Sequence, residues 1–136
     1  MDALLIFAID FDGVIVEERY PAIGPLLPGA KETILWLYGE GHWIIINSCR
    51  TGMEEQEMVE FLRDQGIPFH TANQNLPHRI EMYGNDCRKI GADVYIDDRS
   101  VFSEGIDWMD IRSRLERRLG VERCGERDGR PCVSAR

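Results

Sequence analysis

Short apolar runs alternate along the chain with longer stretches in which apolar residues recur at helical spacing. An apolar run without alternation is typical of a strand that is buried on both faces of a sheet. We expect three such strands, at residues 3–9, 42–46 and 92–96. A shorter strand is expected at residues 67–69, where Pro68 indicates a strand start or a sheet edge.

Helices are predicted between these strands. Pro28 and Gly29 open a helix that stops at residues 39–41, and Thr51 and Glu54 have the spacing of a capping box at the start of another, which ends near residue 65. A short helix is expected at residues 76–83 and a final one at about 106–119. Residues 14–27, with two prolines and a glycine, are expected to form an irregular flap.

This alternation of strands and helices predicts an α/β fold with a mainly parallel sheet. The length of 136 residues fits one domain. We assign residues 1–119 to that domain and expect residues 120–136, rich in charge and glycine, to form a flexible tail. In such sheets, ligands bind beyond the carboxyl ends of the strands, near a switch in strand order.

Polar side chains gather at those predicted strand ends. They comprise Asp10 and Asp12 after the first strand, Ser48, Cys49 and Arg50 after the second, and Lys89 before and Asp97, Asp98 and Arg99 after the last. Carboxylates clustered at buried strand ends repel one another unless a cation offsets their charge. Mg²⁺ prefers oxygen ligands and combines a few carboxylates with a substrate phosphate. The pattern therefore predicts magnesium-assisted phosphoryl transfer, with one carboxylate as nucleophile and another as acid and base.

Four segments, in order, resemble the motifs of the haloacid dehalogenase-like (HAD) phosphohydrolases. Residues 6–14 resemble the first motif, residues 44–48 the second, Lys89 the lysine of the third and residues 95–98 the acidic fourth. The resemblance covers about residues 4 to 100. It implies a Rossmann-like three-layer sandwich and hydrolysis of phosphomonoesters through an aspartyl-phosphate, with Mg²⁺ as cofactor.

The same resemblance implies the roles of single residues. Asp10 is the expected nucleophile and Asp12 the acid and base, while Ser48 and Lys89 are expected to hold the phosphoryl group. The expected metal ligands are Asp10, Asp97 and the main-chain carbonyl of Asp12. Asp98 is expected either to ligate the metal directly or to lie next to its ligands. Cys49 and Arg50 are candidate substrate contacts, with a surface ion pair as the alternative for Arg50.

The spacing of the motifs leaves no room for the cap domain that many HAD enzymes carry. Residues 13–28 suffice only for a flap, and the interval between Ser48 and Lys89 is filled by two helices and a strand. Capless members of the family tend to have open sites that act on macromolecules or are covered by a neighbouring subunit. The substrate is therefore expected to be a small molecule or an exposed macromolecular phosphate. Assembly into a homo-oligomer is one way in which such an open site would be covered.

The charge and composition of the chain limit the kinds of partner that it is expected to bind. The formal net charge is −8, yet the segment from Arg112 onward is basic. An acidic main body argues against binding along a nucleic-acid backbone. The first apolar run is too short to span a membrane, and no signal peptide is recognisable, so we expect a cytoplasmic protein without a membrane partner. The four cysteines, without metal-binding spacing, are expected to be reduced thiols.

Two alternatives stay open beside the phosphatase. One is a regulatory module that binds phosphate or a metal without turnover. The other is a phosphatase of nucleic-acid terminal phosphates, which the missing cap allows and the acidic body opposes. In receiver domains, which also cluster acids, the lysine follows the last strand, whereas Lys89 precedes it, and this order favours the hydrolase.

Overall fold

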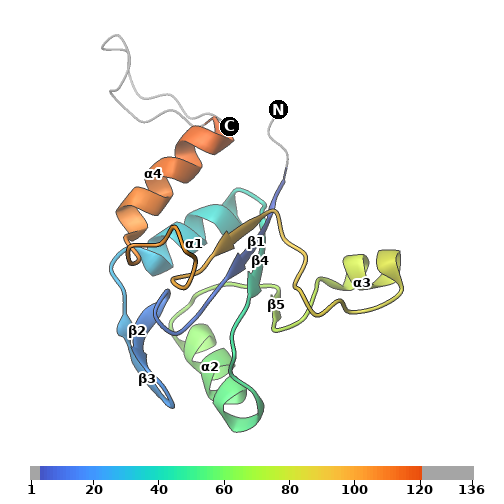
Figure 1. The fold of residues 1–136 in the computed structure, drawn as a ribbon, viewed down its shortest axis with the longest axis horizontal. Coiled ribbons are helices and arrows are strands. Elements are labelled where there is room, and N and C mark those ends of the chain that lie inside the picture. Colours follow the sequence, from blue (N-terminus) through green and yellow to red (C-terminus); the bar gives the residue numbers. More distant parts are fainter. Residues whose placement is uncertain (1–3, 121–136) are drawn as a thin grey trace.

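Four parallel strands form the central sheet, in the order β5-β4-β1-β6. The computed structural model describes residues 4–120, and the predicted tail beyond Gly120, with Cys124 and Cys132, lies outside them. The strands are β1 (Ile6–Ile9), β4 (Trp43–Ile46), β5 (Thr71–Ala72) and β6 (Val94–Ile96). The protein is thus α/β with a mainly parallel sheet, as predicted (Figure 1).

The first strand is central because its residues are apolar on both faces. Phe7 and Ile9 lie in the larger core cluster, and Ile6 and Ala8 lie in a smaller one. β1 pairs with β4 on one side and with β6 on the other. The strand order therefore reverses at β1, and the carboxyl ends of β1, β4 and β6 meet at one edge.

The larger core lies between one face of the sheet and three helices: α1 (Ala30–Gly39), α2 (Gly52–Asp64) and α4 (Trp108–Leu119). Buried positions in α1 recur at helical spacing, at Ala30, Thr33, Ile34 and Leu37. The opposite face is covered more thinly, by Leu76 and Ile90 among others. The short helix α3 (Pro77–Tyr83) contributes no buried residue and projects away from the sheet (Figure 1).

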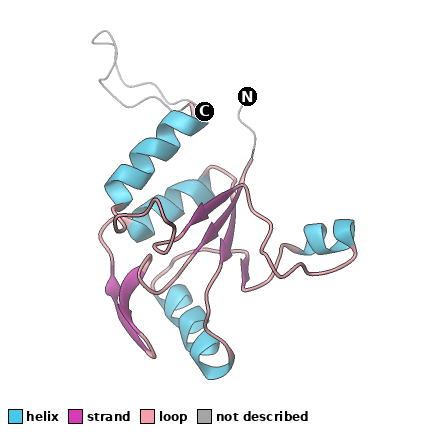
Figure 2. Cartoon of the chain, in the orientation of Figure 1, coloured by secondary structure: helices cyan, strands magenta, loops and turns pink. Residues whose placement is uncertain are grey.

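The predicted flap is ordered, which corrects our expectation of an irregular segment. Residues 14–27 contain the antiparallel hairpin of β2 (Val16–Arg19) and β3 (Ala22–Leu26), drawn as a separate pair of strands in Figure 2. The prolines at 21 and 25 suggested an irregular segment, but Pro21 lies at the hairpin tip, between the paired residues Arg19 and Ala22.

The prediction of a strand at residues 67–69 is wrong, because the strand that pairs with β4 is β5, at Thr71–Ala72. The amides of His70 and Asn73 donate to the carbonyls of Ile44 and Ile46 and so fix this register. Pro68 has no N–H to donate, and Ile67 is buried in the core under the sheet instead.

The start of α2 also differs from the prediction. Thr51 occupies the N-cap position, but its side chain accepts no capping hydrogen bond, so the predicted capping box does not form. This end of the helix is held through Glu55, whose side chain accepts a hydrogen bond from Asn73. Helix α4, in contrast, is capped by Asp107, which accepts from the amides of Met109 and Asp110.

No helix among the described residues is both long enough and apolar enough to cross a membrane. Within residues 4–120, the interval between the first and second predicted motifs holds the hairpin and α1, and the interval between the second and third holds α2, β5 and α3.

Candidate active site at the carboxyl edge of the sheet

Backbone hydrogen bonds continue beyond the carboxyl ends of β1, β4 and β6, so the residues that follow these strands lie next to one another. The amide of Asp10 donates to the carbonyl of Ile96 at 3.0 Å, and the amide of Asn47 donates to that of Ile9 at 2.8 Å. The residues that follow β1, β4 and β6 therefore share one edge. A cavity of about 600 Å³ opens there, lined by Asp10, Asp12, Glu18, Tyr20, Asn47, Ser48, Cys49, Arg50, Asp97 and Arg99.

Three carboxylates converge at this edge. Asp10, Asp97 and Asp98 each offer an oxygen, and these oxygens lie within 4.8 Å of one another. Oδ1 of Asp98 is buried and has no hydrogen-bond partner among residues 4–120. A buried carboxylate oxygen without a partner is costly, and a bound cation would satisfy it.

Gly13 allows Asp98 to reach this position. Its φ is +84°, in the left-handed region that favours glycine, and a Cβ at this position would collide with Oδ2 of Asp98. Gly13 thus allows the turn after Asp12 and also leaves room for the carboxylate of Asp98.

Asp10 is held by its own loop and crowded by its neighbours. The amide of Phe11 donates to its Oδ1 at 2.7 Å, and the residue lines the cavity. The pKa of Asp10 is raised to about 6: burial raises it most, the hydrogen bond from the Phe11 amide lowers it, and the charges of Asp97 and Asp98 raise it.

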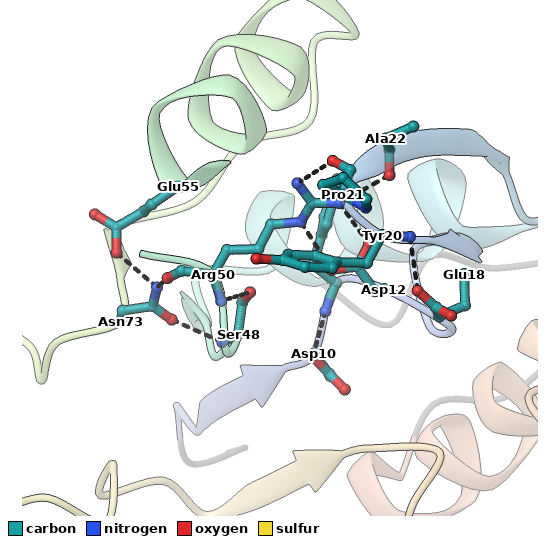
Figure 3. A network of polar contacts seen from close by, with 11 residues as sticks. Asp10, Asp12, Glu18, Tyr20, Pro21, Ala22, Ser48, Arg50, Glu55 and Asn73 are labelled. Carbon is teal, nitrogen blue, oxygen red and sulfur yellow. Dashed lines mark hydrogen bonds and ion pairs between the residues drawn. The ribbon is translucent and has the colours of Figure 1, made fainter. Parts of the chain in front are cut away.

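Asp12 is directed toward Arg50 (Figure 3) and is not one of the three clustered carboxylates. Its two oxygens accept from Nε and Nη2 of Arg50, both at 2.8 Å. Hydrogen bonding to Asp12 raises the pKa of Arg50 above its ordinary value. The structure therefore brings Asp12 and Arg50 together, a pairing that the sequence pattern did not predict.

The loop after β4 is shaped by Ser48 and Asn73. The Ser48 amide donates to Oδ1 of Asn73 at 2.7 Å, and the Arg50 amide donates to Oγ of Ser48 at 2.9 Å. Nδ2 of Asn73 donates to the carbonyl of Arg50. Because the hydroxyl of Ser48 acts as acceptor here, its own hydrogen is left to donate toward the cavity. Cys49, a free thiol, is exposed at the same rim.

Lys89 is placed apart from the cavity lining. Its side chain is exposed, and its Nζ lies 5.2 Å from the centre of the Tyr95 ring. The loop that carries it is fastened by Asn75, a buried amide that bonds Asp86, the carbonyl of Cys87 and the amide of Gly91. The predicted phosphate-binding role of Lys89 stays a prediction.

Arg99 and Glu18 also line the cavity. Arg99 lies directly after Asp97 and Asp98, which follow β6. It could therefore be identified from the sequence as one of the polar residues after a predicted strand. Glu18 could not be found in this way, because it lies in the hairpin that the sequence pattern left irregular. Its Oε2 accepts from the amide of Tyr20 at the hairpin tip.

The fold and this edge define an α/β protein whose carboxylate cluster lies at the switch in strand order. No protein-family model matches the sequence, and no curated protein is significantly similar to it. A solved structure, described as that of a conserved protein from Bacteroides thetaiotaomicron, is 40% identical with a TM-score of 0.76. The alignment covers 85% of this chain and 93% of that one. The chain belongs to the same family as this conserved bacterial protein.

Proposed function

We propose that this protein is a magnesium-dependent phosphatase with a Rossmann-like fold of the HAD type, which hydrolyses phosphomonoesters through an aspartyl-phosphate on Asp10. The observation that carries the proposal is the convergence of Asp10, Asp97 and Asp98 beside a cavity at the switch in strand order. Ligands of open parallel sheets bind at this point, and three carboxylates there suit a phosphate only together with a cation.

The donor set fits Mg²⁺. Carboxylate oxygens are the protein ligands that this hard cation prefers, and the buried Oδ1 of Asp98 has no hydrogen-bond partner in the part of the chain that the structure describes. Asp10, Asp97 and Asp98 would hold the ion. When bound, Mg²⁺ offsets the negative charge of the site and of a substrate phosphate.

Asp10 and Asp12 supply the covalent chemistry of the proposal. The Phe11 amide fixes one oxygen of Asp10, so the other attacks phosphorus as the bond to the leaving oxygen breaks. Asp12 gives a proton to the leaving oxygen, then takes one from the water that cleaves the aspartyl-phosphate and releases phosphate. Ser48 donates to a phosphoryl oxygen, where charge develops in the transition state.

The test is hydrolysis of a generic aryl phosphate with Mg²⁺, comparing the wild-type chain with Asp10→Asn. We expect Asp10→Asn to abolish phosphate release, and chelation with EDTA to do the same until Mg²⁺ is restored. Asp110→Asn is the matched control, because this exposed acid on α4 pairs only with Arg114 among the described contacts of its side chain. Full turnover by purified Asp10→Asn would remove the nucleophile assignment.

One observation favours a second candidate, a regulatory module that binds metal or phosphate without turnover. Lys89, the expected phosphate-binding cation, is not among the residues that line the cavity. Such a module would bind Mg²⁺ and inorganic phosphate, measured by calorimetry, yet release no phosphate beyond a single equivalent. Multiple turnover by the wild-type chain rejects it.

A further inference from the structure

The most completely bonded side chain at the cavity is Arg50. It is only 1% exposed although it lines the cavity, and each of its guanidinium nitrogens has a partner. Nε and Nη2 donate to the two oxygens of Asp12, Nη1 donates to the carbonyl of Pro21 at 3.1 Å, and Nη2 also donates to that of Ala22 at 2.9 Å.

Arg50 also lies close to two aromatic rings. Its guanidinium carbon lies 5.4 Å from the centre of the Phe11 ring and 5.0 Å from that of Tyr20. Phe11 belongs to the acidic loop after β1, and Tyr20 belongs to the hairpin tip. The guanidinium of Arg50, on the loop after β4, therefore contacts two other segments, residues 11–12 and 20–22. Its contacts with Asp12 and the hairpin tip are drawn in Figure 3.

These contacts leave little of Arg50 for a ligand. A guanidinium has five N–H groups, and four hydrogen bonds to protein acceptors are already made. Asp12 keeps more capacity, because a carboxylate has about four acceptor positions and Arg50 takes one on each oxygen. The fork geometry fixes the plane of the Asp12 carboxylate, and the side chain of Asp12 stays 17% exposed.

We infer that Arg50 is a positioning residue that ties Asp12 to the tip of the β2–β3 hairpin and thereby fixes both the acid and base and the wall of the cavity. This inference rests on the proposed function for the role of Asp12. The tether itself is a structural claim: loss of either partner frees the hairpin tip, where Arg19 pairs with Ala22.

The tether is tested by hydrogen exchange of the whole chain, read by mass spectrometry over residues 17–23. Arg50→Gln and Asp12→Asn should both accelerate exchange there by about tenfold or more, while α1 keeps wild-type protection, which shows that the variants fold. Arg19→Gln is the matched control, because Arg19 is an exposed arginine on the same hairpin whose side chain, among the described residues, bonds only Glu17. Unchanged exchange in both test variants would overturn the inference.

Catalysis tests the positioning role separately. Arg50→Gln should lower kcat by about 100-fold on an alkyl phosphate, with KM little changed, and by clearly less on p-nitrophenyl phosphate, whose leaving oxygen needs no proton. Arg50→Lys should not restore the rate, because an ammonium cannot form the two-pronged bond. A rise in KM alone, an equal loss on both esters, or rescue by lysine would contradict positioning.

The two arms separate failure of this inference from failure of the proposed function. A wild-type chain without phosphatase activity, together with faster exchange in both variants, rejects the phosphatase and supports the tether. An active wild-type chain with unchanged exchange and equal losses supports the phosphatase and rejects the tether.

Discussion

Asp10→Asn should stabilise the metal-free protein at neutral pH. The reason is the crowding of carboxylates at the sheet edge, where burial and the charges of Asp97 and Asp98 raise the pKa of Asp10 from 3.8 to about 6. A carboxyl group with a raised pKa in the folded state binds its proton more tightly there than in the unfolded chain. Its contribution to stability is therefore present below pH 3.8 and is lost as the pH rises through 6.

The magnitude follows from the size of the shift. Each pKa unit corresponds to about 1.4 kcal/mol, which gives an upper limit of about 3 kcal/mol for Asp10. Because its side chain is only partly buried, solvent screening reduces the expected effect to about 1–2 kcal/mol. Asparagine keeps the shape and can still accept from the Phe11 amide, but it carries no charge.

The assay is urea unfolding in EDTA, followed by tryptophan fluorescence between pH 4 and pH 7.5. The difference in unfolding free energy between Asp10→Asn and the wild-type chain should be small at pH 4 and should reach about 1–2 kcal/mol in favour of the variant above pH 6.5. Added Mg²⁺ should stabilise the wild-type chain more than the variant, since only the former keeps all three carboxylates. A difference independent of pH, or a variant less stable at pH 7, would refute the reasoning.

Three further substitutions test the packing around the site. Gly13→Ala should destabilise the fold by about 1–3 kcal/mol and weaken Mg²⁺ binding measured by calorimetry, because its Cβ collides with Asp98 and its φ is left-handed; wild-type affinity would contradict this. Trp108→Phe should cost about 1–3 kcal/mol in urea unfolding, because the indole bonds the carbonyl of Val14 at 2.7 Å in the core; an unchanged midpoint would be the contrary result. Asn75→Ala should cost about 2 kcal/mol or more and speed amide exchange over residues 86–91, because it removes three bonds that hold that loop; a loop as protected as in the wild-type chain would argue against it.

The carboxylate cluster could be predicted from the sequence because it needs only two facts. Uninterrupted apolar runs mark buried parallel strands, and the residues after such strands share an edge. Asp10 and Asp97 follow two runs of this kind, and the backbone bond between Asp10 and Ile96 makes them neighbours. No side-chain detail was needed for this step.

The pairing of Asp12 with Arg50 could not be predicted in this way. The same spacing is compatible with an arginine that contacts substrate or forms a surface pair, because the choice depends on where the hairpin tip lies. The carbonyls of Pro21 and Ala22 provide the remaining acceptors, and they belong to the segment whose prolines and glycine suggested an irregular flap. Lys89 shows the same dependence on tertiary structure, since its place follows from the loop that Asn75 holds.

The sequence by itself determined the local elements whose signal is hydrophobic: the core strands, the helices behind them and the acidic ends that follow. Tertiary structure decided which neighbour each segment pairs with. The residues at 67–69 are apolar enough for a strand, yet β4 pairs with Thr71 and Ala72, because register depends on hydrogen bonds between distant segments. The pairing of side chains such as Asp12 and Arg50 depends on how distant segments are placed in the fold. The periodicity of a single segment does not predict that placement.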